Sequence, residues 1–225
     1  PRSYSLTDDL TMPQVVERLL ALGFSAEAPA IVQRVYLDSF DWGALKRGRA
    51  VVHETSEGGG RVEVRSLANG MAPVGGPLRD APRHAADVPQ ESVRCRLASL
   101  VGIRRLFPVV DLSCEQRRFR LLDRNRKTVC RATLERCEAR KKGGRTRRSL
   151  SERVSLEPVK GYRGPGTRVA RVLEEELGLA HAGRSALEEA LETLGVATPL
   201  DDSPAAARID ADTTTGGAVS RLFAE

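Results

Sequence analysis

Residues 128–136, TVCRATLER, alternate in character from one position to the next. Successive side chains of an extended strand point to opposite faces of its sheet. One face would then carry Val129, Arg131, Thr133 and Glu135, and the other Thr128, Cys130, Ala132 and Leu134. The stretch therefore predicts a β-strand with one mostly polar face and one mostly apolar face.

Three neighbouring segments show the same alternation. Between 116 and 123, Arg118 and Arg120 oppose Phe119 and Leu121. Between 151 and 160, the polar set Arg153, Ser155 and Glu157 (with Val159) opposes Val154 and Leu156. Between 61 and 67, Arg61, Glu63 and Arg65 oppose Val62 and Val64. Tight turns around 57–60 and 123–126 connect consecutive strands, which predicts antiparallel pairing.

The pattern along the whole chain predicts an α+β fold that is mainly antiparallel β. Strands are expected at 3–6, 31–38, 49–55, 61–67, 107–113, 116–123, 128–140 and 151–160, and helices at 13–22, 89–100, 167–177 and 185–194. Loops are expected at 71–87 and, as a basic hairpin, at 141–148. About eight such strands can close into a tunnel-like β-barrel with flanking helices and a C-terminal helical segment, because closure removes exposed edges.

Three regions are expected from this pattern. Residues 1–165 would form the barrel domain and 166–197 a helical extension. Residues 198–225 would be a linker followed by the start of another helical domain.

The charge of the chain is concentrated in its middle. The net charge is +6, yet between Arg94 and Arg171 there are 23 Lys/Arg and only 7 Asp/Glu. Such a block favours an anionic partner or a solvated surface. No apolar run approaches the roughly 20 residues of a membrane helix, so no membrane partner is expected.

The cysteines and histidines do not suggest a metal centre. Cys95, Cys114, Cys130 and Cys137 include no C-x-x-C pair, and the three histidines are scattered. We therefore expect free thiols in a cytoplasmic protein.

Arginines that line a barrel interior would make a strong anion site, because guanidinium pairs bidentately with phosphate and a low dielectric strengthens the attraction. In that arrangement the polar faces point inward and the apolar faces pack against helices. The alternative is an ordinary antiparallel sheet whose Arg/Glu face lies in water.

Several motifs resemble the CYTH, or triphosphate tunnel, superfamily over residues 1–175. Residues 33–42, QRVYLDSFDW, resemble its "YYDT/YLDT" strand and turn, and 45–48, LKRG, its step into the next strand. Residues 126–129, RKTV, followed by Leu134 and Glu135, resemble its D-G-K-x-V…E hairpin strand. Residues 154–162 resemble the last barrel strand of bacterial proteins that join this domain to CHAD, a helical domain associated with polyphosphate.

The resemblance implies a tunnel of about eight antiparallel strands in which basic residues bind a triphosphate and acidic residues hold Mg²⁺ or Mn²⁺. The phosphate-binding candidates are Arg34, Arg61, Arg65, Arg118, Arg120, Lys127 and Arg131. Glu135 and Glu157 are candidate metal ligands, with ion pairing to the arginines as the alternative.

Two family motifs are not found in these residues, and the first Glu of one of them would fall before Pro1. The E-x-E-x-K strand corresponds to residues 1–6, where Ser3 falls near the Lys position and Pro1 near the second Glu. The R-x-R motif of the third strand corresponds to Val52 and Glu54. These departures shift the expectation from hydrolysis to binding, and no catalytic residue is assigned.

Three hypotheses follow. The first is binding of inorganic polyphosphate or a triphosphate-like anion without catalysis, as an accessory to a CHAD-type domain in cis. The second is a metal-dependent triphosphatase or adenylyl cyclase that uses Mg²⁺ or Mn²⁺. The third is a basic interaction module built on the loop 140–148; this loop lacks aromatic side chains for base stacking, so a nucleic-acid partner is not expected.

Overall fold

The computed structural model describes residues 2–6, 10–68 and 73–199 of the chain. One sheet contains the strands β1 (Arg2–Ser5), β2 (Phe24–Ala26), β3 (Ala30–Asp38), β4 (Arg49–Ser56), β5 (Gly59–Ser66), β6 (Val74–Pro77), β7 (Phe107–Leu122), β8 (Thr128–Lys141), β9 (Arg147–Ser149), β10 (Arg153–Pro158) and β11 (Ala180–His181). The helices are α1 (Met12–Ala21), α2 (Glu91–Val101), α3 (Arg163–Glu176) and α4 (Ala186–Thr193), with short 3-10 turns η1 (Leu45–Arg47) and η2 (Ala85–Asp87).

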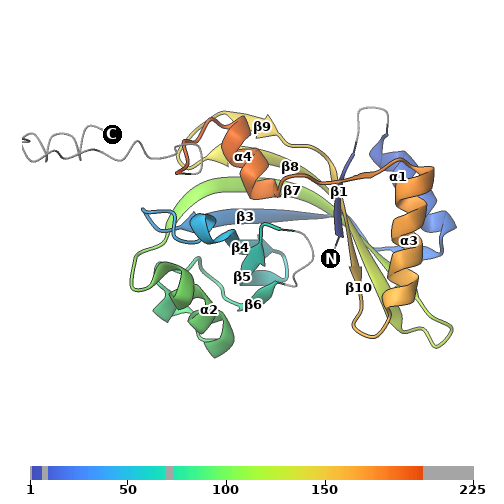
Figure 1. Ribbon diagram of the computed structural model, residues 1–225, viewed down its shortest axis with the longest axis horizontal. Coiled ribbons are helices and arrows are strands. Elements are labelled where there is room, and N and C mark those ends of the chain that lie inside the picture. Colours follow the sequence, from blue (N-terminus) through green and yellow to red (C-terminus); the bar gives the residue numbers. More distant parts are fainter. Residues whose placement is uncertain (1, 7–9, 69–72, 200–225) are drawn as a thin grey trace, which may run out of the picture.

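The sheet has the strand order β11-β1-β10-β8-β7-β3-β4-β5-β6, with β2 added to β7 and β9 added to β8. Every pair within it is antiparallel. The long strands β7 and β8 curve so that the sheet wraps around an interior (Figure 1). The expected antiparallel, tunnel-like fold is confirmed, although among the described residues the hydrogen-bonded path ends at β6 and β11 instead of closing.

The hairpin of β7 and β8 is the longest unit of the sheet. Its turn is closed by Asp123, whose Oδ1 accepts hydrogen bonds from the backbone N–H groups of Asn125 and Lys127, both at 2.9 Å. The two strands predicted at 107–113 and 116–123 are one continuous strand of 16 residues. No Gly interrupts the alternation between them, so nothing in the local sequence ends the strand.

The turn after β3 is organised by a buried carboxylate. Asp38 accepts hydrogen bonds from the backbone N–H groups of Ser39, Ala44 and Leu45, at 2.8–2.9 Å. Unpaired N–H groups in a buried turn would be costly, so the side chain of this motif residue stabilises the step into η1 and β4.

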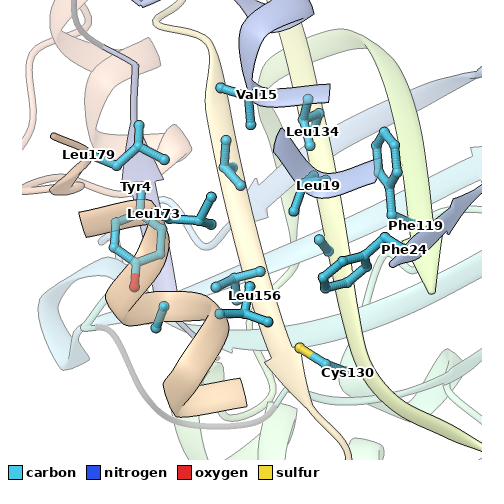
Figure 2. Packing of buried hydrophobic residues seen from close by; sticks show 14 residues of the cluster. Tyr4, Val15, Leu19, Phe24, Phe119, Cys130, Leu134, Leu156, Leu173 and Leu179 are labelled. Atoms are coloured by element: carbon cyan, nitrogen blue, oxygen red, sulfur yellow. The ribbon is translucent and has the colours of Figure 1, made fainter. Parts of the chain in front are cut away.

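The apolar strand faces point outward and are covered by helices. Tyr4, Phe119, Leu134 and Leu156 are buried against α1 and α3, which contribute Leu19 and Leu173 among others (Figure 2). The outer faces of β4 and β5 pack in the same way on α2. Because alternate side chains point the opposite way, the polar sets of these strands face the interior.

Helix α4 lies against the interior face of the sheet. Its residues Leu187, Ala190 and Leu191 pack with Tyr36 and Leu112, together with other inward-facing apolar residues of β3, β4, β7 and β8. One end of the interior is thus filled by an apolar core, and the polar interior is confined to the other end.

Three local predictions were wrong in part. The predicted loop at 71–87 contains β6 and η2, and the predicted basic hairpin loop at 141–148 contains the start of β9. Strands β2 and β11 were not predicted. These strands are only two to four residues long and pair at the periphery, so their sequence carries little periodic signal.

The expectation of free thiols was wrong for two cysteines. Cys114 and Cys137 are direct cross-strand partners in β7 and β8, with Cα atoms 4.1 Å apart, and they form a disulfide. Their spacing in sequence gives no sign of this, because only the register of the hairpin brings the two side chains together. Cys95 and Cys130 are free.

The predicted helical start at 218–225 lies outside the described residues, as does the predicted linker beyond residue 199. None of the described helices is both long and apolar enough to span a membrane.

Candidate functional site

A polar cavity of about 550 Å³ occupies the interior beside α4. Its described lining includes nine arginines and five glutamates. The arginines are Arg2, Arg34, Arg61, Arg65, Arg118, Arg120, Arg131, Arg153 and Arg184, and the glutamates are Glu27, Glu54, Glu63, Glu135 and Glu157. Arg2, Arg153 and Arg184 pair with glutamates outside this lining. The arginines still outnumber the carboxylates that contact them, and this sign of charge favours an anion.

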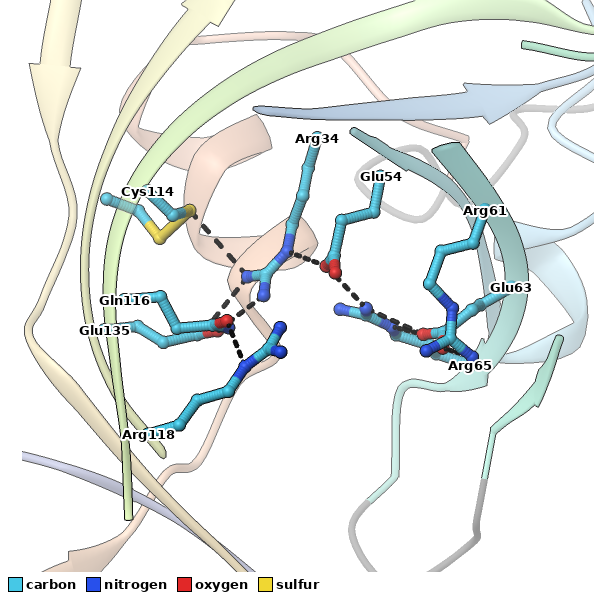
Figure 3. Close-up of polar contacts among 10 residues, drawn as sticks. Arg34, Glu54, Arg61, Glu63, Arg65, Cys114, Gln116, Arg118 and Glu135 are labelled. Carbon is cyan, nitrogen blue, oxygen red and sulfur yellow. Dashed lines mark hydrogen bonds and ion pairs between the residues drawn. A yellow bond between two sulfur atoms is a disulfide. The ribbon is translucent and has the colours of Figure 1, made fainter. Parts of the chain in front are cut away.

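Arg34 is the centre of a buried ion network. Its guanidinium lies between two carboxylates: Nε is 2.8 Å from Glu54 Oε2, and Nη2 is 2.5 Å from Glu135 Oε1. Nη1 also contacts Glu135 Oε2 at 3.0 Å and Sγ of Cys114 at 3.7 Å (Figure 3). Because two ionised carboxylates contact this one guanidinium, the positive charge of Arg34 is neutralised and does not attract an anionic ligand.

The network shifts the ionisation of its acids. Burial alone would raise the pKa of Glu135, but the charge and hydrogen bonds of Arg34 outweigh it and lower that pKa to about 2. Glu54 is affected in the same way, with its pKa lowered by Arg34 and Arg65 against the effect of burial. Both carboxylates are therefore ionised in the resting protein.

A second group on β5 is also neutralised. Arg65 contacts Glu63 at 2.7 Å and Glu54 at 3.2 Å, and Arg61 contacts Glu63 at 2.6 Å. Together with Arg34 and Glu135 these residues contain three positive and three negative charges. With Glu135 of β8 included, the wall formed by β3, β4 and β5 is therefore close to neutral.

The opposite wall, formed by β7, β8 and β10, carries three arginines that do not belong to this network: Arg118, Arg120 and Arg131. Arg120 and Arg131 are direct cross-strand partners, and Arg118 lies two residues before Arg120 on the same face. Arg120 pairs with Glu27 at 2.8 Å, but over the described ranges neither Arg118 nor Arg131 lies within ion-pair distance of a carboxylate. The free positive charge of the cavity is concentrated here.

The structure brings together six of the seven arginine and lysine candidates predicted from the sequence. Arg34, Arg61, Arg65, Arg118, Arg120 and Arg131 all line the cavity. Lys127 is exposed in the turn between β7 and β8 and is absent from the described lining.

The two predicted metal ligands are separated. Glu157 is paired in register with Arg131, four residues from Glu135 along β8, which is roughly 13 Å at 3.3 Å per residue. Glu135 is already bound by Arg34 and by Gln116. Within residues 2–6, 10–68 and 73–199, no three His, Cys, Asp or Glu side chains converge on a position that could hold a metal ion. This geometry does not favour a shared metal at Glu135 and Glu157.

Sequence reasoning missed several lining residues. Gln116 shares the inward face of β7 with Arg118 and Arg120, so the two-residue period would have identified it. Arg184 precedes α4 and pairs with Glu192 of that helix. No periodic signal places Arg184 at the cavity, because only the packing of α4 brings it there.

Comparison with known proteins gives a likeness in structure only. No family model matches the chain, and no curated protein matches it. A solved structure from Bacillus halodurans, assigned as an adenylate cyclase, has a TM-score of 0.55 at 11% identity and covers 82% of this chain and 91% of its own. A protein from Hippeastrum, assigned as an adenylyl cyclase and described as having a dominant triphosphatase activity, has a TM-score of 0.55 at 11% identity, with coverage of 89% and 97%. The chain shares their fold over most of its length.

Proposed function

We propose that the cavity binds a short chain of phosphate groups, such as a triphosphate or the end of inorganic polyphosphate, without cleaving it. The observation that carries this proposal is a pair of cavity arginines, Arg118 and Arg131, that have no carboxylate partner among the described residues. A third arginine, Arg120, lies beside them as the direct cross-strand partner of Arg131. The proposal includes an accessory role beside a helical polyphosphate-binding domain encoded downstream in the same cytoplasmic protein.

The cross-strand pair of arginines favours a bound anion. Like charges directly opposite each other in a sheet are destabilising. Arg120 and Arg131 nevertheless face the same interior, and among the described residues one carboxylate, that of Glu27, is within ion-pair distance of the pair. Glu157 is the cross-strand neighbour of Arg131 on β10 but forms no ion pair with it. A phosphate oxygen between them would offset the repulsion and accept charge-assisted hydrogen bonds from both.

Phosphate fits the chemistry of this wall better than a carboxylate ligand does. Guanidinium groups spaced along one strand face match a ligand that repeats negative groups along a chain. The similarity in fold to a protein described as a triphosphatase supports the same class of ligand.

The arrangement of acids supports binding over hydrolysis. Metal-dependent phosphoryl transfer needs carboxylates that converge on a metal and on the phosphate. Here Glu54, Glu63 and Glu135 are committed to arginines, and Glu157 stands apart from them. A metal-dependent triphosphatase is the second candidate, favoured by the description of the Hippeastrum protein.

The test is a calorimetric titration of tripolyphosphate into the wild type and the double variant Arg118→Ala/Arg131→Ala at fixed salt. Each charge-assisted contact contributes roughly 1.5–3 kcal/mol, so the double variant should bind at least about 100-fold more weakly. The matched control is Arg145→Ala/Arg148→Ala, which removes the same charge from exposed positions in the turn before β9 and in β9 itself. This control should bind like the wild type.

Three results would contradict the proposal. Equal affinity of the cavity variant and the wild type would show that the interior is not the site. Release of phosphate in the presence of Mn²⁺ would show that the protein hydrolyses the ligand, as the second candidate, a metal-dependent triphosphatase, requires. If the hairpin variant loses affinity for tripolyphosphate and duplex DNA alike, the chain is a general basic module.

A further inference from the structure

Gln116 connects the neutral and the basic halves of the cavity. It is only 5% exposed and lies on the inward face of β7, two residues before Arg118. Its Nε2 donates a hydrogen bond to Glu135 Oε1 at 2.6 Å, and its Oε1 accepts one from Arg118 Nε at 2.8 Å. Figure 3 shows Arg34, Glu135, Gln116 and Arg118 as one continuous chain of contacts.

The orientation of this amide is set by its neighbours. An ionised carboxylate only accepts hydrogen bonds, and a guanidinium only donates them. Glu135 is ionised because Arg34 lowers its pKa to about 2 in spite of burial. The NH₂ group of Gln116 must therefore face Glu135, and its oxygen must face Arg118.

The same contact leaves the outer end of Arg118 available. Nε is used by Gln116, whereas Nη1 and Nη2 have no carboxylate partner among the described residues. These two nitrogens form a planar fork that matches two oxygens of one phosphate. Arg118 is exposed to the cavity, so the fork can reach a ligand without desolvating a buried group.

We infer that Gln116 is a positioning residue that aims the Nη fork of Arg118 at one phosphate group, which makes Arg118 the primary subsite of the cavity. The inference rests on the proposed function, because it concerns the same ligand. It adds that affinity depends on a residue that need not touch the ligand. The buried Arg34 and Glu135 then contribute to binding by supporting the amide of Gln116.

The test is a double-mutant cycle of tripolyphosphate affinity, measured by calorimetry. Gln116→Met keeps the length of the side chain and removes both hydrogen bonds. Affinity should fall roughly five- to tenfold, because the charge of Arg118 remains but its alignment is lost. In an Arg118→Ala background the same substitution should have no further effect, since Gln116 acts through Arg118.

A matched control and a second variant complete the experiment. Gln33→Met makes the same change on β3, where Gln33 Nε2 contacts Ser113 Oγ at 2.9 Å on an exposed surface outside the cavity lining. Its affinity should equal that of the wild type. Arg118→Lys keeps the positive charge on an exposed side chain but has no fork, so it should bind more weakly than the wild type, by about as much as Gln116→Met, and more tightly than Arg118→Ala.

The outcomes separate this inference from the proposed function. If Arg118→Ala weakens binding while Gln116→Met does not, the positioning role is wrong and phosphate binding stands. Wild-type affinity for Arg118→Lys, or an effect of Gln116→Met that persists without Arg118, would also overturn it. A wild type that does not bind tripolyphosphate would overturn both.

Discussion

Glu135→Gln is the substitution that most directly tests the buried ion network. Arg34 is 4% exposed and lies between Glu54 and Glu135, so the substitution leaves a buried guanidinium with one carboxylate in place of two. Glutamine has nearly the same shape as glutamate, and its oxygen can still accept a hydrogen bond from Arg34. The change therefore isolates the charge of Glu135 from its packing.

Two estimates of its cost agree. The pKa of Glu135 is lowered from 4.5 to about 2, mainly by Arg34 acting against burial. At 1.36 kcal/mol per pKa unit this corresponds to about 3 kcal/mol of folding free energy at neutral pH. Removing one partner of a buried ion pair costs about 3–5 kcal/mol in other proteins. Because glutamine keeps one hydrogen bond, the lower end of that range, about 3 kcal/mol, is expected.

The cost should depend on pH in one direction. Since the folded pKa of Glu135 lies below its unfolded value, the charge stabilises the fold fully above pH 4.5 and loses this effect as the pH falls toward 2. Glutamine does not titrate. The difference between wild type and variant should therefore be largest near neutrality and fall to roughly half by pH 3.

The assay is urea-induced unfolding followed by far-ultraviolet circular dichroism at neutral pH and at several acidic values. The control is Glu157→Gln, because Glu157 is exposed and forms no ion pair among the described residues; its effect should stay within about 0.5 kcal/mol. If the free energies of unfolding of the wild type and Glu135→Gln differ by less than about 1 kcal/mol at neutral pH, or if the difference does not shrink on acidification, the ion pair of Glu135 with Arg34 does not stabilise the fold as expected.

Three further predictions concern other parts of the fold. Asp38→Ala should destabilise the protein by about 3 kcal/mol in urea unfolding, because it leaves buried backbone N–H groups unpaired, whereas Asp38→Asn should cost less. Tyr4, buried and hydrogen-bonded to Glu174, has its pKa raised to about 12, so an ultraviolet absorbance titration should show a step near that pH that Tyr4→Phe removes. Alkylation of the denatured, unreduced chain followed by mass spectrometry should modify two cysteines and leave Cys114 and Cys137 unmodified, while four modified cysteines would disprove the disulfide.

The strand faces could be predicted from the sequence because they depend on a local rule. Arg118, Arg120 and Arg131 point inward because their neighbours Phe119 and Ala132 are apolar and pack outside. The turn at Asp38 was likewise visible in a short motif. The short strands β2, β6 and β9 were missed or predicted as loops, since three or four residues do not establish a period.

The candidate site was predicted less completely than the fold. Six of the predicted arginines line one cavity, but which of them are ion-paired was not predicted. Arg34 is paired with Glu54, 20 residues away, and with Glu135, 101 residues away. Such pairs depend on the order and register of β3, β4 and β8, which no local pattern contains.

The sequence by itself determined the antiparallel alternation, the concentration of positive charge between residues 94 and 171, and the placement of the arginines on the strand faces opposite the apolar side chains. These properties follow from the two-residue period of a strand and from the need to bury apolar side chains. Only the tertiary structure decided that α4 fills one end of the interior, that Cys114 and Cys137 pair, and that Arg34, Arg61 and Arg65 are neutralised. It also decided that Arg118 and Arg131 remain free of carboxylate partners among the described residues. The physical reason is that ion pairing and packing act over a few ångströms in space, between residues that the chain alone keeps far apart.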